Sequence, residues 1–152
     1  MRIAELLENE NIEYDMETHP AAFTARELAW SEQARPHQVV KPVLVEADGR
    51  KIMCAVPGDR RIDFSALRNV LGCDDVHLVD ESELERTCLD CEVGAEPPVG
   101  RIFGLSTVMD ASVRDESWVY FQAGTHNTAI IMEEPDFERV ACPKIGRFTR
   151  PV

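Results

Sequence analysis

Residues 38–56 read QVVKPVLVEADGRKIMCAV. Two runs rich in Val and other apolar residues, Gln38 to Glu46 and Lys51 to Val56, flank the residues Ala-Asp-Gly-Arg at positions 47–50. Apolar runs of this length on either side of a short polar turn are typical of two paired strands. The stretch therefore predicts a β-hairpin, and we work outward from it.

The segments around the hairpin carry start and stop signals for short helices. Thr24 and Glu27 have the capping-box pattern, in which a hydroxyl and a carboxylate three residues apart bond free amides at a helix start. Asp63 and Gly72 bracket a second helix, and Asp80 begins a third. Together with hydrophobic spacing, these signals predict helices at 2–10, 25–30, 64–71, 81–88 and 136–140, and strands at 12–16, 76–79, 102–109, 118–122 and 128–132.

This order of elements predicts the fold class. Helices and strands intermix without strict βαβ alternation, so we expect an α+β domain spanning residues 1–152, with a mixed, largely antiparallel sheet and flanking helices. The 152 residues are 44% hydrophobic, which suits one core. No apolar stretch reaches the roughly 18 residues of a membrane span, and the N-terminal MRIAELLE carries acids where a secretory signal is apolar. We therefore expect a cytoplasmic protein without a membrane partner.

The charge is strongly acidic but unevenly distributed. Sixteen Lys and Arg against 28 Asp and Glu give a net charge of −12, which disfavours passive adhesion to DNA or anionic lipid. Acids dominate residues 80–96, whereas the tail from Arg139 carries Lys144, Arg147 and Arg150 and no acid. One RNA-facing side is therefore compatible with the sequence.

Lys41 is the first candidate functional residue, because it is one of three lysines and lies inside a Val-rich strand. Period-two alternation places it on the same face as Val39 and Val43. An ammonium on an apolar face is costly unless an anion meets it, which points to an anionic ligand. The alternative is an edge strand whose lysine reaches water, and Pro42 fits such an edge.

Two loops form the second and third candidates. Gly94-Ala95-Glu96-Pro97-Pro98-Val99-Gly100 places two glycines around a rigid Pro pair, so its amides could face a carbonyl or phosphate oxygen, unless it is only a structural turn. Residues 124–128, Gly-Thr-His-Asn-Thr, bring His126 to a loop between strands, as a general acid or base, a ligand contact or an exposed turn residue.

The cysteines offer a different class of function. Cys88 and Cys91 have zinc or redox spacing, and Cys73 with His77 would complete four ligands. Yet a redox pair of this kind begins a helix, whereas Cys88 ends one. The five cysteines fit reduced core thiols, and we expect neither a metal nor a cofactor.

Several of these signals occur together in a specific order: His19-Pro20, Thr24-Ala25, Glu27, Val-Val-Lys41, Pro57-Gly58-Asp59-Arg60-Arg61, Gly94 with Pro98 and Gly100, Asp110, and Ala123-Gly124. In this order, over nearly its whole length, the sequence resembles the YbaK family, also called the prolyl-tRNA synthetase-associated editing-domain family. The resemblance implies an α+β domain that hydrolyses the ester bond of a mischarged aminoacyl-tRNA. It implies as substrate tRNA(Pro) carrying Ala or Cys, bound by its acceptor end, with prolyl-tRNA synthetase as a candidate partner.

The resemblance also implies roles for individual residues. Lys41 matches the family's essential lysine, which engages the terminal adenosine near its phosphate. Gly94 to Gly100 matches the loop whose backbone positions the scissile carbonyl, and His126 belongs to the loop that closes the pocket. The expected catalytic set is Lys41, Gly94, Gly100 and His126, and the expected substrate-binding set is His19, Thr24, Pro98, Gly124 and Thr125.

Two positions depart from the family pattern. Asp90 stands where members commonly have glycine, and Pro42 follows the lysine where Thr or Asn is usual. These departures put the amino-acid specificity in doubt. Two other classes stay open: a non-catalytic module of the same fold that binds a nucleotide or a synthetase, and a thiol or metal protein that uses Cys88 and Cys91.

Overall fold

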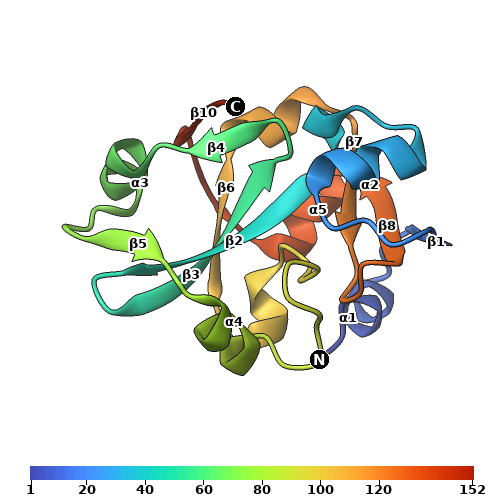
Figure 1. The fold of residues 1–152 in the computed structure, drawn as a ribbon, viewed down its shortest axis with the longest axis horizontal. Coiled ribbons are helices and arrows are strands. Elements are labelled where there is room, and N and C mark those ends of the chain that lie inside the picture. The colour runs from blue at the N-terminus through green and yellow to red at the C-terminus, as the bar shows by residue number, and fades with distance from the viewer.

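The computed structural model describes all of residues 1–152 (Figure 1). Five α-helices, three short 3₁₀-helices and ten strands follow one another along the chain. In order, they are α1 (Ile3–Asn9), β1 (Asp15–Thr18), α2 (Ala25–Glu32), η1 (Pro36–Gln38), β2 (Val40–Ala47), β3 (Arg50–Pro57), β4 (Arg60–Ile62), α3 (Phe64–Leu71), β5 (Val76–Leu78), α4 (Glu81–Thr87), η2 (Gly100–Phe103), β6 (Ser106–Asp110), η3 (Ala111–Asp115), β7 (Trp118–Gln122), β8 (Thr128–Glu133), α5 (Glu134–Ala141), β9 (Lys144–Gly146) and β10 (Thr149–Pro151).

The strands form three sheets. The largest has the order β5-β2-β3-β6-β9, with antiparallel pairs on the β2 side and parallel pairs from β3 to β6 and from β6 to β9. A sheet of order β1-β8-β7 and a two-stranded ribbon of β4 and β10 are antiparallel throughout. The predicted class, α+β with mixed and largely antiparallel pairing, is confirmed.

The predicted hairpin is the centre of the large sheet. Residues 40–47 pair with residues 50–57 around Asp48-Gly49, whose φ angles of 47° and 83° are those of the tight turns that match strand twist. β5 pairs with Val45 to Ala47 only, so the first half of β2 is an edge. Pro42 lies on this edge, where its missing N–H leaves no ladder bond unmade.

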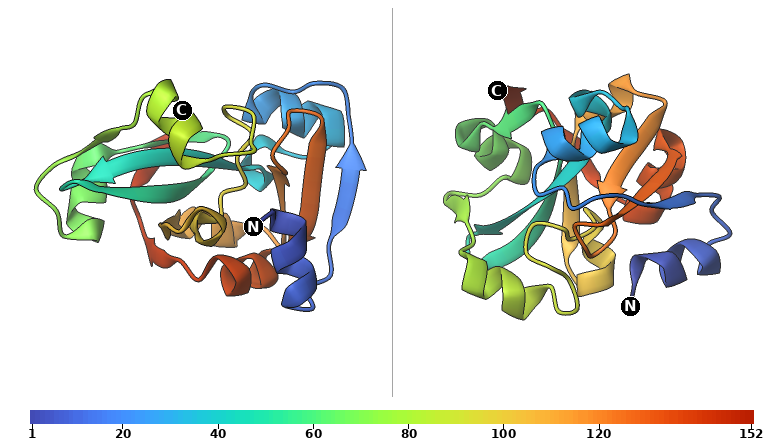
Figure 2. Two further views of the ribbon diagram at one scale, coloured as in Figure 1. Left: turned by 90° about the horizontal axis from the view of Figure 1, so that it is seen from below. Right: turned by 45° about the vertical axis from the view of Figure 1, so that its right-hand side comes forward.

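Three apolar clusters hold these layers together. One lies among α1, α5 and the β7–β8 pair, with the Phe121 and Phe137 rings 5.8 Å apart. A second lies under α3 and includes Val45, Val56 and Phe148, and Val43 packs against it. The third joins α2 to Val39 and Ala129. Figure 2 shows α2 above the strands on one side of the molecule and α1 at its lower edge.

Several predicted boundaries were wrong. The strand expected at 12–16 begins at Asp15, because Ile12 is buried in the first cluster by a turn after α1. The strand expected at 102–109 begins at Ser106, since Ile102 and Phe103 belong to a 3₁₀ turn that ends at Gly104 with φ 73°. The strands β4, β9 and β10 were not predicted, because three-residue strands carry too little periodicity.

No helix of the chain has both the length and the apolar character needed to cross a bilayer.

Candidate active site

A cavity of about 420 Å³ opens where the edge of β2 meets the start of α2. It contains two cations, Lys41 and Arg26, and no Asp or Glu side chain, although the chain has 28 of them. Its walls come from six regions of the chain: Phe23, Thr24, Ala25, Arg26, Leu28, Val39, Val40, Lys41, Pro42, Gly58, Gly94, Gln122 and Val152. An opening of this charge fits an anionic ligand.

Two other hollows are present, one acidic and one that, like the cavity at Lys41, has cations and no Asp or Glu side chain. One between β1 and β8 is lined by the carboxylates of Glu13, Asp15, Glu133 and Asp136. The other lies at the far end of β3 and holds Arg50, Arg101 and Lys144. Neither contains a residue that the sequence predicted as functional, so the cavity at Lys41 is the candidate active site.

Lys41 is half-buried at this cavity and is not paired with any carboxylate. Burial lowers the pKa of its ammonium, and the charge of Asp59 opposes that shift only in part. Strand alternation places Lys41 on the face of Val43 and Val45, which pack in the second cluster. Both predicted features of Lys41 therefore occur together: it lies on an edge strand, and its charge lacks a fixed partner.

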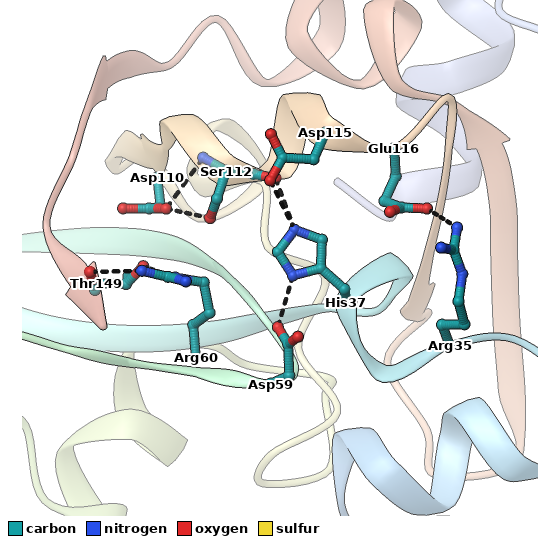
Figure 3. A network of polar contacts seen from close by, with 9 residues as sticks. All are labelled: Arg35, His37, Asp59, Arg60, Asp110, Ser112, Asp115, Glu116 and Thr149. Carbon is teal, nitrogen blue, oxygen red and sulfur yellow. Dashed lines mark hydrogen bonds and ion pairs between the residues drawn. The ribbon is translucent and has the colours of Figure 1, made fainter. Parts of the chain in front are cut away.

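Asp59, in the turn between β3 and β4, connects this cavity to a polar network (Figure 3). Its carboxylate lies 2.7 Å from Nδ1 of His37, and the opposite nitrogen lies 3.0 Å from the Ser112 carbonyl and 3.2 Å from Asp115. Burial opposes protonation of His37, but the hydrogen bond and charge of Asp59, with the Ser112 carbonyl and Asp115, outweigh it and raise the pKa of His37. The network fixes the turn beside Lys41.

The start of α2 forms the opposite rim. The Thr24 hydroxyl accepts from the Glu27 amide at 3.0 Å, so the predicted cap is present, but Glu27 accepts from the Phe23 amide at 3.4 Å and not from Thr24, so the predicted capping box is incomplete. Gly58 allows this rim to approach β3, because a Cβ there would lie 2.6 Å from the Pro36 oxygen. The Thr24 hydroxyl keeps its own proton for a ligand.

The Gly94–Gly100 loop reaches the cavity only through Gly94. The Gly94 amide donates to the Glu96 carboxylate at 3.0 Å, and the Gly100 amide donates to Thr107 Oγ1 at 2.8 Å. Glu96 is buried, and this burial raises its pKa despite the backbone amides of Glu96 and Gly94 and the charge of His126. The amides of Gly94 and Gly100, which sequence reasoning assigned to a substrate oxygen, are therefore engaged within the protein.

His126 is buried behind Gly94 rather than open to the cavity. Its Nδ1 lies 3.0 Å from the Ala22 carbonyl and its Nε2 lies 2.9 Å from the Val93 carbonyl. The His126 amide also donates to Glu92 at 2.7 Å. With both ring nitrogens facing backbone oxygens, the imidazole connects three segments and has no free nitrogen for a substrate.

The remaining predicted residues surround this imidazole. Gly124 has φ 101° and exchanges backbone bonds with Ala95 and Glu92. Thr125 is exposed and bonds Thr128, and Pro98 is buried in its loop. His19 is buried with Nδ1 against the Pro20 carbonyl. Of the nine predicted site residues, those that line the cavity are Lys41, Thr24 and Gly94.

The thiol alternative finds little support in the geometry. Burial raises the pKa of Cys88 to about 12 and that of Cys91 to about 11, so both favour the unreactive thiol form. The chain contains no group of three or more His, Cys, Asp or Glu side chains placed to hold a metal ion. Cys73 and His77 are therefore not brought together with Cys88 and Cys91.

Sequence reasoning missed three residues at this site. Phe23 is 66% exposed at the rim, with its ring 4.7 Å from that of His126. Gln122 lines the cavity and donates to the Ala22 carbonyl, which leaves its Oε1 buried without a partner. Asp59 influences Lys41 from a neighbouring turn. Only the turn motif around Asp59 carried a sequence signal; an aromatic and an amide in a strand usually belong to the core.

The fold and site define an α+β domain with a cation-bearing cavity for an anionic ligand and no activated nucleophile. The sequence profile of the aminoacyl-tRNA editing domain family matches residues 19–140. The chain belongs to this family, which confirms the resemblance seen in the sequence.

The relatives and structural neighbours agree with this membership. The proline–tRNA ligase of Dehalococcoides mccartyi is 32% identical over 120 residues, which cover 79% of this chain and 20% of the ligase. That of Geobacillus thermodenitrificans is 31% identical over 94 residues, or 62% of this chain and 16% of the ligase. The chain thus spans about a fifth or less of the length of these curated relatives.

Two solved structures share the fold. A protein proposed to be a trans-editing enzyme for prolyl-tRNA synthetase superposes with a TM-score of 0.85 at 19% identity, covering 98% of this chain and 95% of its own. A protein described only as hypothetical superposes with a TM-score of 0.89 at 18% identity, over 99% of this chain and 100% of its own.

Proposed function

We propose that this domain, residues 1–152, is an aminoacyl-tRNA deacylase that hydrolyses the ester of a mischarged tRNA in trans. The observation that carries the proposal is the cavity lined by Lys41 and Arg26 without an Asp or Glu side chain, in a chain of the editing family. The 3′ end of an aminoacyl-tRNA is anionic and carries the ester next to a phosphate. A lysine without a fixed partner suits that phosphate.

In the proposed reaction, water adds to the ester carbonyl carbon, the bond from that carbon to the ribose oxygen breaks, and a proton passes to the ribose oxygen. The products are the free amino acid and tRNA. An aminoacyl ester is already activated, so holding the ester and a water in place supplies much of the rate without a Ser or Cys nucleophile. Lys41 anchors the phosphate, and the Thr24 hydroxyl is a free donor near the carbonyl.

In this proposal, the loop residues hold the wall of the cavity in place. His126 and Gly124 hold residues 92–95, and so hold Gly94 at the wall of the cavity. Gly100 and Pro98 fix the base of the same loop, and His19 and Thr125 support its neighbours. A substrate carbonyl that approaches the Gly94 amide must replace Glu96 as its acceptor.

We further propose tRNA(Pro) charged with Ala or Cys as the substrate, met in the cytoplasm alone or beside prolyl-tRNA synthetase. The supporting comparisons are the proline–tRNA ligases that match this chain. A synthetase rejects a smaller or near-isosteric amino acid by only about 1–3 kcal/mol, so a second hydrolytic site is needed. Pro42 lines the cavity and shapes the part that would hold the amino acid.

The test is deacylation of radiolabelled Ala-tRNA(Pro) and Cys-tRNA(Pro), with correctly charged Pro-tRNA(Pro) as the matched substrate control. The wild-type domain should release Ala or Cys and spare Pro. Lys41→Ala should abolish the release, and Lys51→Ala, which removes a partly exposed lysine paired with Glu83, should leave it unchanged. Equal hydrolysis by wild type and Lys41→Ala would refute the mechanism.

A second function has a specific observation in its favour. The amides of Gly94 and Gly100 are already engaged, as in a loop that binds a ligand without reacting with it. A non-catalytic module would bind a nucleotide or a synthetase at the same cavity. Tight binding of uncharged tRNA or adenosine monophosphate, with no release of amino acid from either charged tRNA, would establish this alternative.

A further inference from the structure

Two arginines lie directly opposite each other on the β4–β10 ribbon. Arg61 and Arg150 are register partners in the antiparallel pair, so their side chains share one face. Both are exposed, and neither forms an ion pair. Arg147, three residues before Arg150, is also exposed and unpaired.

Like charges at directly opposed positions destabilise a strand pair. An acid at either position would have replaced this repulsion with attraction. The two carboxylates nearest to Arg61 in the sequence contact other groups. Asp59 contacts His37, and Asp63 accepts the Ala66 amide at the start of α3. The ribbon thus keeps a repulsive arginine pair in a protein of net charge −12, which indicates that an anion outside the chain meets it.

The ribbon is also held rigidly, as a binding surface requires. Phe148, fully buried just before β10, donates its amide to the buried Asp110 at 2.9 Å. The Asp63 amide donates to the Phe148 carbonyl, and Arg60 bonds Thr149 from the other face of the ribbon. Burial opposes ionisation of Asp110, but hydrogen bonds from Ser112, Phe148 and Thr149 outweigh it and keep the pKa of this carboxyl low, so it stays an acceptor.

The ribbon borders the candidate active site. Gly58, just before β4, and Val152, just after β10, both line the cavity of Lys41, and the Val152 amide bonds the Asp59 carbonyl. Figure 1 shows the ribbon at the top of the molecule and the acidic helix α4 at the bottom, and the right panel of Figure 2 agrees. A polyanion that enters the cavity at one end therefore continues over the arginines and away from α4.

We propose that Arg61 and Arg150, with Arg147 beside them, bind the ribose–phosphate backbone of the tRNA acceptor stem beyond its 3′ end. This inference rests on the proposed function and names the surface that receives the rest of the substrate. An RNA backbone is favoured over an acidic peptide because the ribbon is continuous with a cavity for a terminal anion. The backbone contacts carry no sequence information and set the register of the stem.

The experiment compares the double variant Arg61→Gln/Arg150→Gln with Arg2→Gln/Arg86→Gln. The control makes the same change of net charge at exposed positions on α4 and at the start of α1, at the opposite end of the molecule. Binding of uncharged tRNA is measured by fluorescence anisotropy over a range of salt concentrations. The ribbon variant should bind about 10-fold or more weaker, with the salt slope reduced by about 1.4–1.8 for two lost phosphate contacts, and the control should match wild type.

Two further readouts separate a binding role from a structural one. The melting temperature of the ribbon variant should stay the same or rise, because a repulsive pair is removed. The deacylation rate of a minimal substrate, an aminoacyl ester of the trinucleotide CCA, should be unchanged, whereas kcat/KM for full-length charged tRNA should fall in parallel with binding. Arg61→Lys/Arg150→Lys should restore most of the binding.

Equal binding by the ribbon variant and the control, or weaker binding that comes only with a lower melting temperature, would overturn the proposal. Loss of tRNA binding in a domain that hydrolyses neither substrate would support the ribbon as an RNA surface and refute the deacylase reaction. The two proposals therefore fail separately.

Discussion

The β2 edge and the loop wall of the cavity differ in whether their polar groups have partners inside the protein. On the edge, the Lys41 ammonium is half-buried with no carboxylate paired to it. On the loop wall, formed by Gly94 with His126 behind it, both imidazole nitrogens and the amides of Gly94 and His126 have partners inside the protein. An unsatisfied group next to a cavity is available to a ligand, and a fully bonded group holds the wall in place.

The sharpest test of this difference is Lys41→Met. We expect deacylation to fall by about 100-fold or more, since loss of the cation that anchors the phosphate leaves the ester misplaced, and misplacement has effects of this size. The free energy of unfolding should be unchanged or higher, because the variant removes a buried cation without a partner. Denaturant unfolding and single-turnover hydrolysis measure both, and a clear loss of stability would place Lys41 among the structural residues.

His126→Ala should show the reverse pattern. It removes the ring contacts to the Ala22 and Val93 carbonyls, so we expect a loss of about 2–3 kcal/mol in the free energy of unfolding. At a temperature where the variant remains folded, displacement of the loop should raise KM, and the dependence of the rate on pH should stay as in wild type. If the variant kept its full stability but its rate no longer depended on pH on the acidic or the basic side, His126 would instead transfer a proton.

The His37 network beside Lys41 predicts how stability depends on pH. The pKa of His37 is raised in the folded state, so its contribution is fully present below the ordinary value of 6.5 and is lost as the pH rises through the raised pKa. The melting temperature should therefore decline across neutral pH, and His37→Gln should flatten that decline. Identical slopes for His37→Gln and wild type would rule out this network as the cause.

The smallest expected effect concerns the loop wall. Asp90 has φ 68°, a conformation that costs a residue with a side chain more than it costs glycine. Asp90→Gly should raise the free energy of unfolding by about 0.5–1 kcal/mol, and Asp90→Ala should lower it. Thermal melts of the three proteins in one buffer check this order, and a less stable glycine variant would contradict it.

The hairpin, the helix caps and Lys41 were predictable because local patterns encode them. Thr24, Asp63 and Asp80 cap helices as predicted, since a cap depends on residues three positions apart. The roles of His126 and Gly100 were not predictable at the same level. The Ala22 carbonyl is far from His126 in the chain, and the Thr107 hydroxyl meets the Gly100 amide only because the chain folds back through the 3₁₀ turn between them, so no local spacing indicated that these groups were already bonded.

The β4–β10 ribbon was missed for a related reason. Each strand has three residues, and Arg60 and Thr149 are 89 positions apart in the chain. The sequence did show a tail without acids, but it could not show that Arg150 would lie opposite Arg61. A charge pattern predicts a surface only after the topology has brought its parts together.

The pairing of β4 with β10, which lie far apart in the chain, also determines when the site forms during synthesis. β3 and β4 leave the ribosome long before β9 and β10, which complete the large sheet and the ribbon and place Val152 on the cavity wall. A nascent chain that stops before Lys144 can form the hairpin and α3 but lacks that wall, and pairing across such a separation is slow. The domain therefore gains its complete binding site only after residues 144–152 have been synthesised, long after the hairpin that carries Lys41.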